Sequence, residues 1–86
     1  MASHEVLQAF VQAATQGSFS AAARKLGKSQ STVSAAVASL EIDLDVVLFD
    51  RSSRKPTLTP AGHVLLQRAE QVLEASSRLE LAASQL

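Results

Sequence analysis

Small polar side chains gather around position 30 of this 86-residue chain, and their chemistry suits the recognition of nucleic-acid bases. The amide of Gln30 can pair with N6 and N7 of adenine through two hydrogen bonds. Ser31, Thr32 and Ser34 follow at once, and each hydroxyl can donate and accept. Hydroxyls near a helix start also serve as local caps. The cluster predicts a base-contacting surface, with helix capping as the alternative for the hydroxyls and for Thr32 above all.

The formal net charge is zero, but the charges are sorted along the chain. The stretch between positions 41 and 50 carries only carboxylates: Glu41, Asp43, Asp45 and Asp50. The charged residues of positions 17–40 and 51–69, on either side, are all basic: Arg24, Lys25, Lys28, Arg51, Arg54, Lys55 and Arg68. This sorting predicts a cationic face that can follow phosphates. The alternative is a solvated surface on which charges cluster without a partner.

Several kinds of chemistry lack the residues that they need. The chain has no Cys, which excludes disulfides, thiolate–metal sites and cysteine nucleophiles. His4 and His63 have no partner at the spacing of a metal site or a catalytic triad. We therefore expect no cofactor, no metal site and no enzyme activity. Met1 is not followed by a secretory signal, and no apolar run reaches the length of a membrane span, so we expect a cytoplasmic protein.

Three short helices are expected to position these side chains. An apolar stripe predicts the first over residues 3 to 14 or 16, ended by Gly17. The second is expected over 19–26 with Ser18 as its cap, and the third from Ser29 to about Leu44. Val33, Val37, Leu40 and Leu44 recur at helical spacing and are expected to face the core. Two helices joined by a short turn, the second with a small polar start, form the helix-turn-helix pattern, and such a start fits the major groove.

A short β-hairpin, or wing, is expected after the third helix. Residues 48–51 and 57–59 alternate apolar and polar side chains around the polar loop 52–56. This places Arg54 and Lys55 where they suit a minor groove or flanking phosphates, with a solvated loop as the alternative. Arg51 has a structural alternative, which is an ion pair with Glu41 or Asp43.

A long helix is expected from Pro60 to Leu86, capped by Thr59, with a length of roughly 40 Å at 1.5 Å per residue. So long a helix exceeds the reach of the small domain at residues 1–59, so residues 60–86 are expected to serve dimerisation. Steps of four and three, the spacing of a two-helix interface, relate Leu65, Ala69, Val72, Ser76, Leu79, Ala83 and Leu86. Leu66 and Leu73 form a partly separate row for the chain's own core. The alternative is that the whole stripe is intramolecular core.

These segments, taken in order, resemble the DNA-binding domain of LysR-type transcriptional regulators. The similarity runs through Phe10-Val11, the segments 17–26 and 29–34, Leu40-Glu41, Leu44, Leu48 to Arg51, and Leu58 to Gly62. The resemblance implies a mostly α fold, namely a winged helix-turn-helix of three helices and a short β-hairpin followed by a long linker helix. It covers nearly the whole chain without large gaps.

The resemblance also implies function. A bacterial regulator of this type binds an inverted-repeat operator in double-stranded DNA as a homodimer, and the full-length protein can be a tetramer. Its small-molecule inducer binds an effector domain that is absent from this chain, which looks like an excised DNA-binding domain. The implied contacts are Gln30, Ser31 and Ser34 to bases and phosphates, Ser18 and Ser20 to phosphates, and Arg54 at the wing tip. The whole DNA-contacting set expected here is Ser18, Ser20, Ser29, Gln30, Ser31, Thr32, Ser34, Arg51, Arg54 and Lys55.

Three departures from the family pattern, at four positions, matter here. Ser31 and Thr32 stand where a Pro and a small residue are frequent, and Asp45 replaces a frequent Gly. Ala35 stands where an Arg is common, which removes one phosphate or base contact. The competing function is a helical protein-interaction module whose basic residues are incidental, which the zero net charge and Ala35 favour. The ordered set of motifs favours DNA binding.

Overall fold

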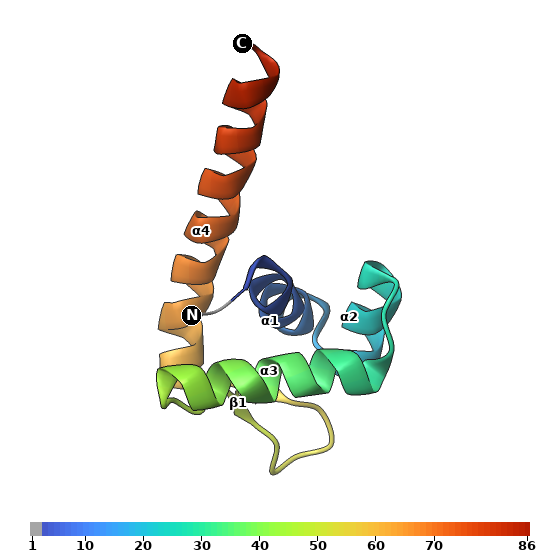
Figure 1. The fold of residues 1–86 in the computed structure, drawn as a ribbon. Helices are drawn as coiled ribbons and strands as arrows, with labels where there is room; N and C mark the ends of the chain where they lie inside the picture. The colour runs from blue at the N-terminus through green and yellow to red at the C-terminus, as the bar shows by residue number, and fades with distance from the viewer. Residues whose placement is uncertain (1–2) are drawn as a thin grey trace.

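The computed structural model describes residues 3–86, and capping residues define most of the helix boundaries. The elements, in order, are α1 (His4–Gln16), α2 (Phe19–Leu26), α3 (Gln30–Leu44), β1 (Phe49–Asp50), β2 (Thr57–Leu58) and α4 (Pro60–Ser84) (Figure 1). This confirms the predicted winged helix-turn-helix with a long last helix. Met1 and Ala2, the first residues of the expected domain, lie outside the described residues.

Hydroxyl side chains cap the helices as predicted. Ser18 Oγ accepts from the backbone N–H of Ala21 at 3.0 Å, and Ser29 Oγ accepts from that of Thr32 at 3.1 Å. These bonds satisfy N–H groups that have no partner within the helix. At the other end of α3, Asp45 has a φ of 53°. It takes the left-handed conformation expected of the Gly that it replaces, which Asp tolerates less well.

The core lies between α1, α2 and α3, which pack against one another. Its largest fully buried side chains are Phe10, Leu40, Leu48, Val33 and Val37. The Phe49 ring packs edge-on against Phe10, with ring centroids 5.8 Å apart, and against Phe19, at 5.5 Å. All three Phe side chains of the chain belong to this core, although Phe19 is only half-buried. β1 is thereby fixed to both α1 and α2.

The helix α4 begins against the core and then leaves it. A Cβ on Gly62 would collide with the carbonyl oxygen of Leu48, so only Gly allows this close approach. Ala69 is 5% exposed and packs in the core, whereas most residues beyond Val72 are exposed. At 25 residues the helix is about 38 Å long, and it projects well past the other helices (Figure 1).

Some expectations about the ends of elements were wrong. The strands are shorter than predicted, with only Phe49 opposite Leu58 and Asp50 opposite Thr57. Leu44, expected in the core, is 44% exposed because it is the last residue of α3. Within residues 3–86, no helix is long and apolar enough to cross a membrane.

Candidate nucleic-acid interface

An open groove lies between the start of α2, the start of α3 and the wing. It has a volume of about 330 Å³. Its lining residues are Ser18, Phe19, Ser20, Gln30, Arg51, Ser53, Arg54, Lys55 and Pro56. The groove therefore brings together predicted contacts from three separate segments of the chain: Ser18, Ser20, Gln30, Arg51, Arg54 and Lys55. Ser53 and Pro56 were not predicted at the site, because their place at the groove depends on how the wing folds.

The lining of this groove is cationic. Arg51, Arg54 and Lys55 contribute positive charge, and none of the lining side chains named above is a carboxylate. The helix α2 also begins at the groove, and the positive end of a helix dipole favours anions. The Ser18 and Ser20 hydroxyls lie 3.5 Å apart at this helix start. The groove is thus suited to a phosphate backbone although the chain is neutral as a whole.

The start of α3 divides into exposed side chains and capping side chains. Gln30 is exposed and is free to meet a base edge. The Ser29 hydroxyl lies 2.7 Å from that of Thr32 and 3.2 Å from that of Ser31, besides capping the helix. The predicted cap at Ser29 is therefore confirmed, and the Thr32 hydroxyl lies beside it. Ser34 is half-buried, one turn behind Gln30 on the same helix.

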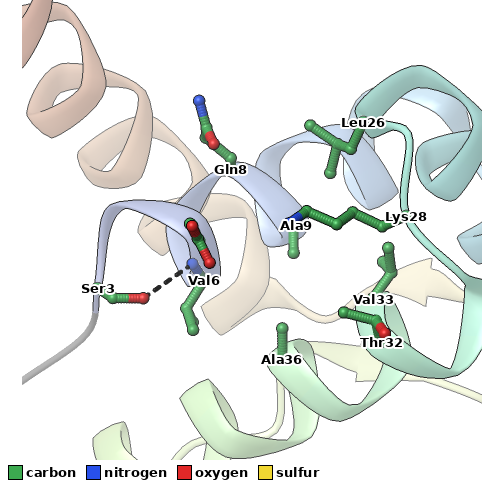
Figure 2. Close-up of a pocket in the computed structure, with 10 residues that line it drawn as sticks. Ser3, Val6, Gln8, Ala9, Leu26, Lys28, Thr32, Val33 and Ala36 are labelled. Atoms are coloured by element: carbon green, nitrogen blue, oxygen red, sulfur yellow. Dashed lines mark hydrogen bonds between the residues drawn. The ribbon is translucent and has the colours of Figure 1, made fainter.

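Thr32 lies away from the groove. It lines a separate cavity of about 290 Å³ between α1 and α3, together with Ala9, Leu26 and Lys28 (Figure 2). Ser29, Ser31 and Ser34 are also absent from the groove lining. The structure thus gathers the second-helix, wing and Gln30 contacts at one groove and leaves the rest of the predicted α3 set outside it.

Arg51 holds two structural contacts at the edge of the groove. Its Nη2 is 3.5 Å from Glu41 Oε1, and its guanidinium lies 4.9 Å from the centroid of the Phe19 ring. The predicted alternative of an ion pair with Glu41 is confirmed. The side chain remains 43% exposed, so it can still face a phosphate. The contact between Arg51 and the Phe19 ring was not predicted, because the two residues are distant in sequence.

The wing tip is organised by short-range bonds that leave its cations exposed. Ser53 Oγ donates to the carbonyl oxygen of Lys55 at 2.9 Å, and the Ser52 N–H donates to Asp50 Oδ1 at 2.9 Å. Hydrogen bonding by the Ser52 side chain and, to a smaller extent, by the Ser52 backbone N–H holds the pKa of the Asp50 carboxyl below its usual value. Arg54 and Lys55 are exposed at the tip.

The residues of the predicted dimer row on α4 differ in exposure. Ala69 is buried in its own chain and Leu65 is half-buried against the same core. Val72 is 51% exposed and Leu79 72%. An apolar cleft of about 190 Å³ lies beside this part of α4, and it is lined by Leu7, Phe10, Leu40, Leu44, Leu65, Arg68, Ala69 and Val72.

Comparison with known proteins decides the family. The sequence model of the "Bacterial regulatory helix-turn-helix protein, lysR family" matches residues 4–63. This chain belongs to the LysR family. Residues 4–63 are therefore the helix-turn-helix domain of a family of transcription regulators, not of enzymes.

Relatives and solved structures agree with the LysR assignment. The HTH-type transcriptional regulator AceR of Acinetobacter baumannii is 56% identical over 57 residues, which are 66% of this chain. The chain spans 19% of the length of AceR. The structure of a CbnR_DBD-DNA complex has a TM-score of 0.90 at 36% identity and covers 95% of this chain and 94% of that one. A BenM_DBD/catB site 1 DNA complex has a TM-score of 0.92 at 30% identity, covering 96% and 92%. The LysR-type fold thus extends over α4 as well as the helix-turn-helix.

Proposed function

We propose that this LysR-type domain binds an inverted-repeat operator in duplex DNA as a homodimer, with the start of α3 in the major groove and the wing at the minor groove. The groove that unites Gln30 with the cations of the wing carries the proposal. Gln30 supplies a base-reading amide, and Arg54 supplies a guanidinium suited to a narrow, negative minor groove. Two solved structures of the same fold are complexes with DNA, which supports this assignment.

The exposed apolar face of α4 supports the dimer. Val72 and Leu79 lie seven residues apart, as on one side of a two-helix interface, and both are mostly exposed in the single chain. Since Ala69 is already covered, we propose that the dimer row begins at Val72 and continues through Ser76, Leu79, Ala83 and Leu86. A dimer places two α3 starts on one duplex, which matches an inverted repeat.

The relative AceR is much longer than this chain, which spans 19% of its length. We propose that a small-molecule inducer acts through a segment outside this chain, since AceR is several times longer. A tetramer of the full-length protein is compatible with a dimer through α4. DNA as the ligand favours a cytoplasmic location.

Selection from a random duplex pool tests the function directly. The chain should enrich a sequence with two related half-sites, and its affinity for the enriched duplex should fall steeply with salt. Each neutralised phosphate adds about −0.9 to the slope of log affinity against log salt. Failure to enrich any sequence, together with a flat slope, would favour the helical interaction module and reject this proposal.

A further inference from the structure

The wing is joined to the domain by very little regular structure. β1 and β2 pair over two residues each, and residues 51–55 between them are exposed. A two-stranded hairpin by itself is marginally stable in water. Contacts from other elements must therefore fix the position of the wing relative to α3.

Glu41, near the end of α3, supplies such contacts. Its Oε2 accepts hydrogen bonds from the backbone N–H groups of Leu48 at 2.7 Å and Phe49 at 3.3 Å. Its other oxygen, Oε1, is 3.5 Å from Nη2 of Arg51. The Glu41 side chain is only 19% exposed, and hydrogen bonds to an ionised acceptor are stronger than neutral ones. One carboxylate thus holds both the entry to β1 and the first residue after it.

Arg51 extends this link to α2. Its guanidinium lies over the ring of Phe19, the first residue of α2, and both side chains line the groove. Cations are attracted to the face of an aromatic ring. Glu41 is therefore connected, directly or through Arg51, to every element that surrounds the groove: α2, α3 and the wing.

We propose that Glu41 is a positioning residue for DNA binding, which fixes the wing at the angle where Arg54 and Gln30 can engage the same duplex. The proposal rests on the proposed function. A carboxylate repels phosphates, so Glu41 gains nothing from touching DNA itself. Its effect on affinity passes through the wing tip.

A double-mutant cycle tests this route. Glu41→Ala and Arg54→Ala are made singly and together, and affinity is measured for a duplex that the unmodified chain enriches from a random pool. We expect Glu41→Ala to weaken binding about tenfold alone and to have little further effect once Arg54 is gone, since residues that act together are not additive. When Glu41→Ala is combined with Gln30→Ala, the fold-losses of affinity of the two variants should multiply. Glu41→Gln keeps an acceptor oxygen for the two N–H groups and should lose less affinity than Glu41→Ala.

Two controls separate positioning from charge and from stability. Asp43→Ala removes the same charge from an exposed carboxylate on the same helix, and it should leave affinity nearly unchanged. Hydrogen exchange without DNA should speed up at the Leu48 and Phe49 amides in Glu41→Ala while the Val37 amide in the core keeps its rate.

The outcomes distinguish this inference from the function on which it rests. The affinity loss of the Glu41→Ala, Arg54→Ala double variant could instead equal the product of the two single losses, or the Val37 amide could also exchange faster in Glu41→Ala. Either result would make Glu41 a general stability residue and overturn the inference while DNA binding stands. If the unmodified chain enriches no duplex, the proposed function itself fails.

Discussion

The hydroxyl of Thr59 donates a hydrogen bond of 2.6 Å to the carbonyl oxygen of Val47, twelve residues earlier in the chain. The hydroxyl oxygen of Thr59 also accepts a hydrogen bond from the backbone N–H of Gly62 at 2.9 Å and so caps α4. The backbone N–H of Thr59 also donates to the carbonyl oxygen of Leu48 at 3.0 Å. A single residue thus starts α4 and ties it to the segment that leads into the wing.

Thr59→Ala should lower the free energy of unfolding by roughly 1–2 kcal/mol, because it removes an N-cap together with a bond to a distant carbonyl. Thr59→Ser keeps the hydroxyl and is the matched control, expected within about 0.5 kcal/mol of the unmodified chain. Urea unfolding measures both variants. Equal stability of the Ala and Ser variants would show that the hydroxyl contributes nothing at this junction.

Gly62→Ala should destabilise the chain although Ala is the better helix former. The added Cβ would meet backbone, the carbonyl group of Leu48, which cannot move aside as a flexible side chain can. We expect a loss of about 1–3 kcal/mol, the cost of overpacking, where helix propensity alone predicts a gain of about 1 kcal/mol. Urea unfolding distinguishes the two signs.

The control for Gly62→Ala is Ala61→Gly, one residue earlier at an exposed position. It tests helix propensity without a packing change and should lower the free energy of unfolding by about 1 kcal/mol. A Gly62→Ala chain that unfolds at higher urea than the unmodified one would contradict the close approach of α4 to Leu48.

Leu79→Glu should convert a dimer into a monomer, because the proposed dimer row would then bury a carboxylate without a partner at a cost of several kcal/mol. Leu79 is 72% exposed in the single chain, so the change should leave the monomer fold intact. Sedimentation gives the mass, and circular dichroism checks the helix content.

Leu81→Glu is the matched control for this prediction. Leu81 is 59% exposed and lies about 200° around the helix from Leu79, so this variant should remain a dimer. A dimer with Glu at position 79, or a monomer with Glu at 81, would move the interface to another face of α4.

How far the sequence predicts this fold depends on the range of the interactions. The boundaries of α2 and α3 follow from Ser18, Ser29 and Gly27, because a cap is satisfied within a few residues. The role of Glu41 does not follow, since its partners at Leu48 and Phe49 are brought near only by the complete fold. Spacing alone also could not separate Ala69 from Leu79, because helical periodicity identifies an apolar face but not what covers it.

The prediction that tests the DNA interface most fully compares Gln30 with Arg54. Gln30 is exposed at the start of α3, and its amide can discriminate one base pair in each half-site. Gln30→Ala should therefore cost roughly 1–3 kcal/mol per contact on the enriched duplex and little on random DNA. Equal weakening on both DNAs would make Gln30 a backbone contact and would move specificity to Ser31 or Ser34.

Arg54 is exposed at the wing tip, where the proposed function requires its guanidinium to meet phosphates or a narrow minor groove. Arg54→Ala should weaken binding to both the enriched and the random duplex, because the contact is mostly electrostatic. It should lower the slope of log affinity against log salt by about one unit per subunit and reduce any preference for A·T-rich flanking sequence. Binding of both variants to both duplexes across a salt series measures all of these effects. An Arg54→Ala chain with an unchanged salt slope would remove the wing from the interface, because a lost phosphate contact must release fewer counterions.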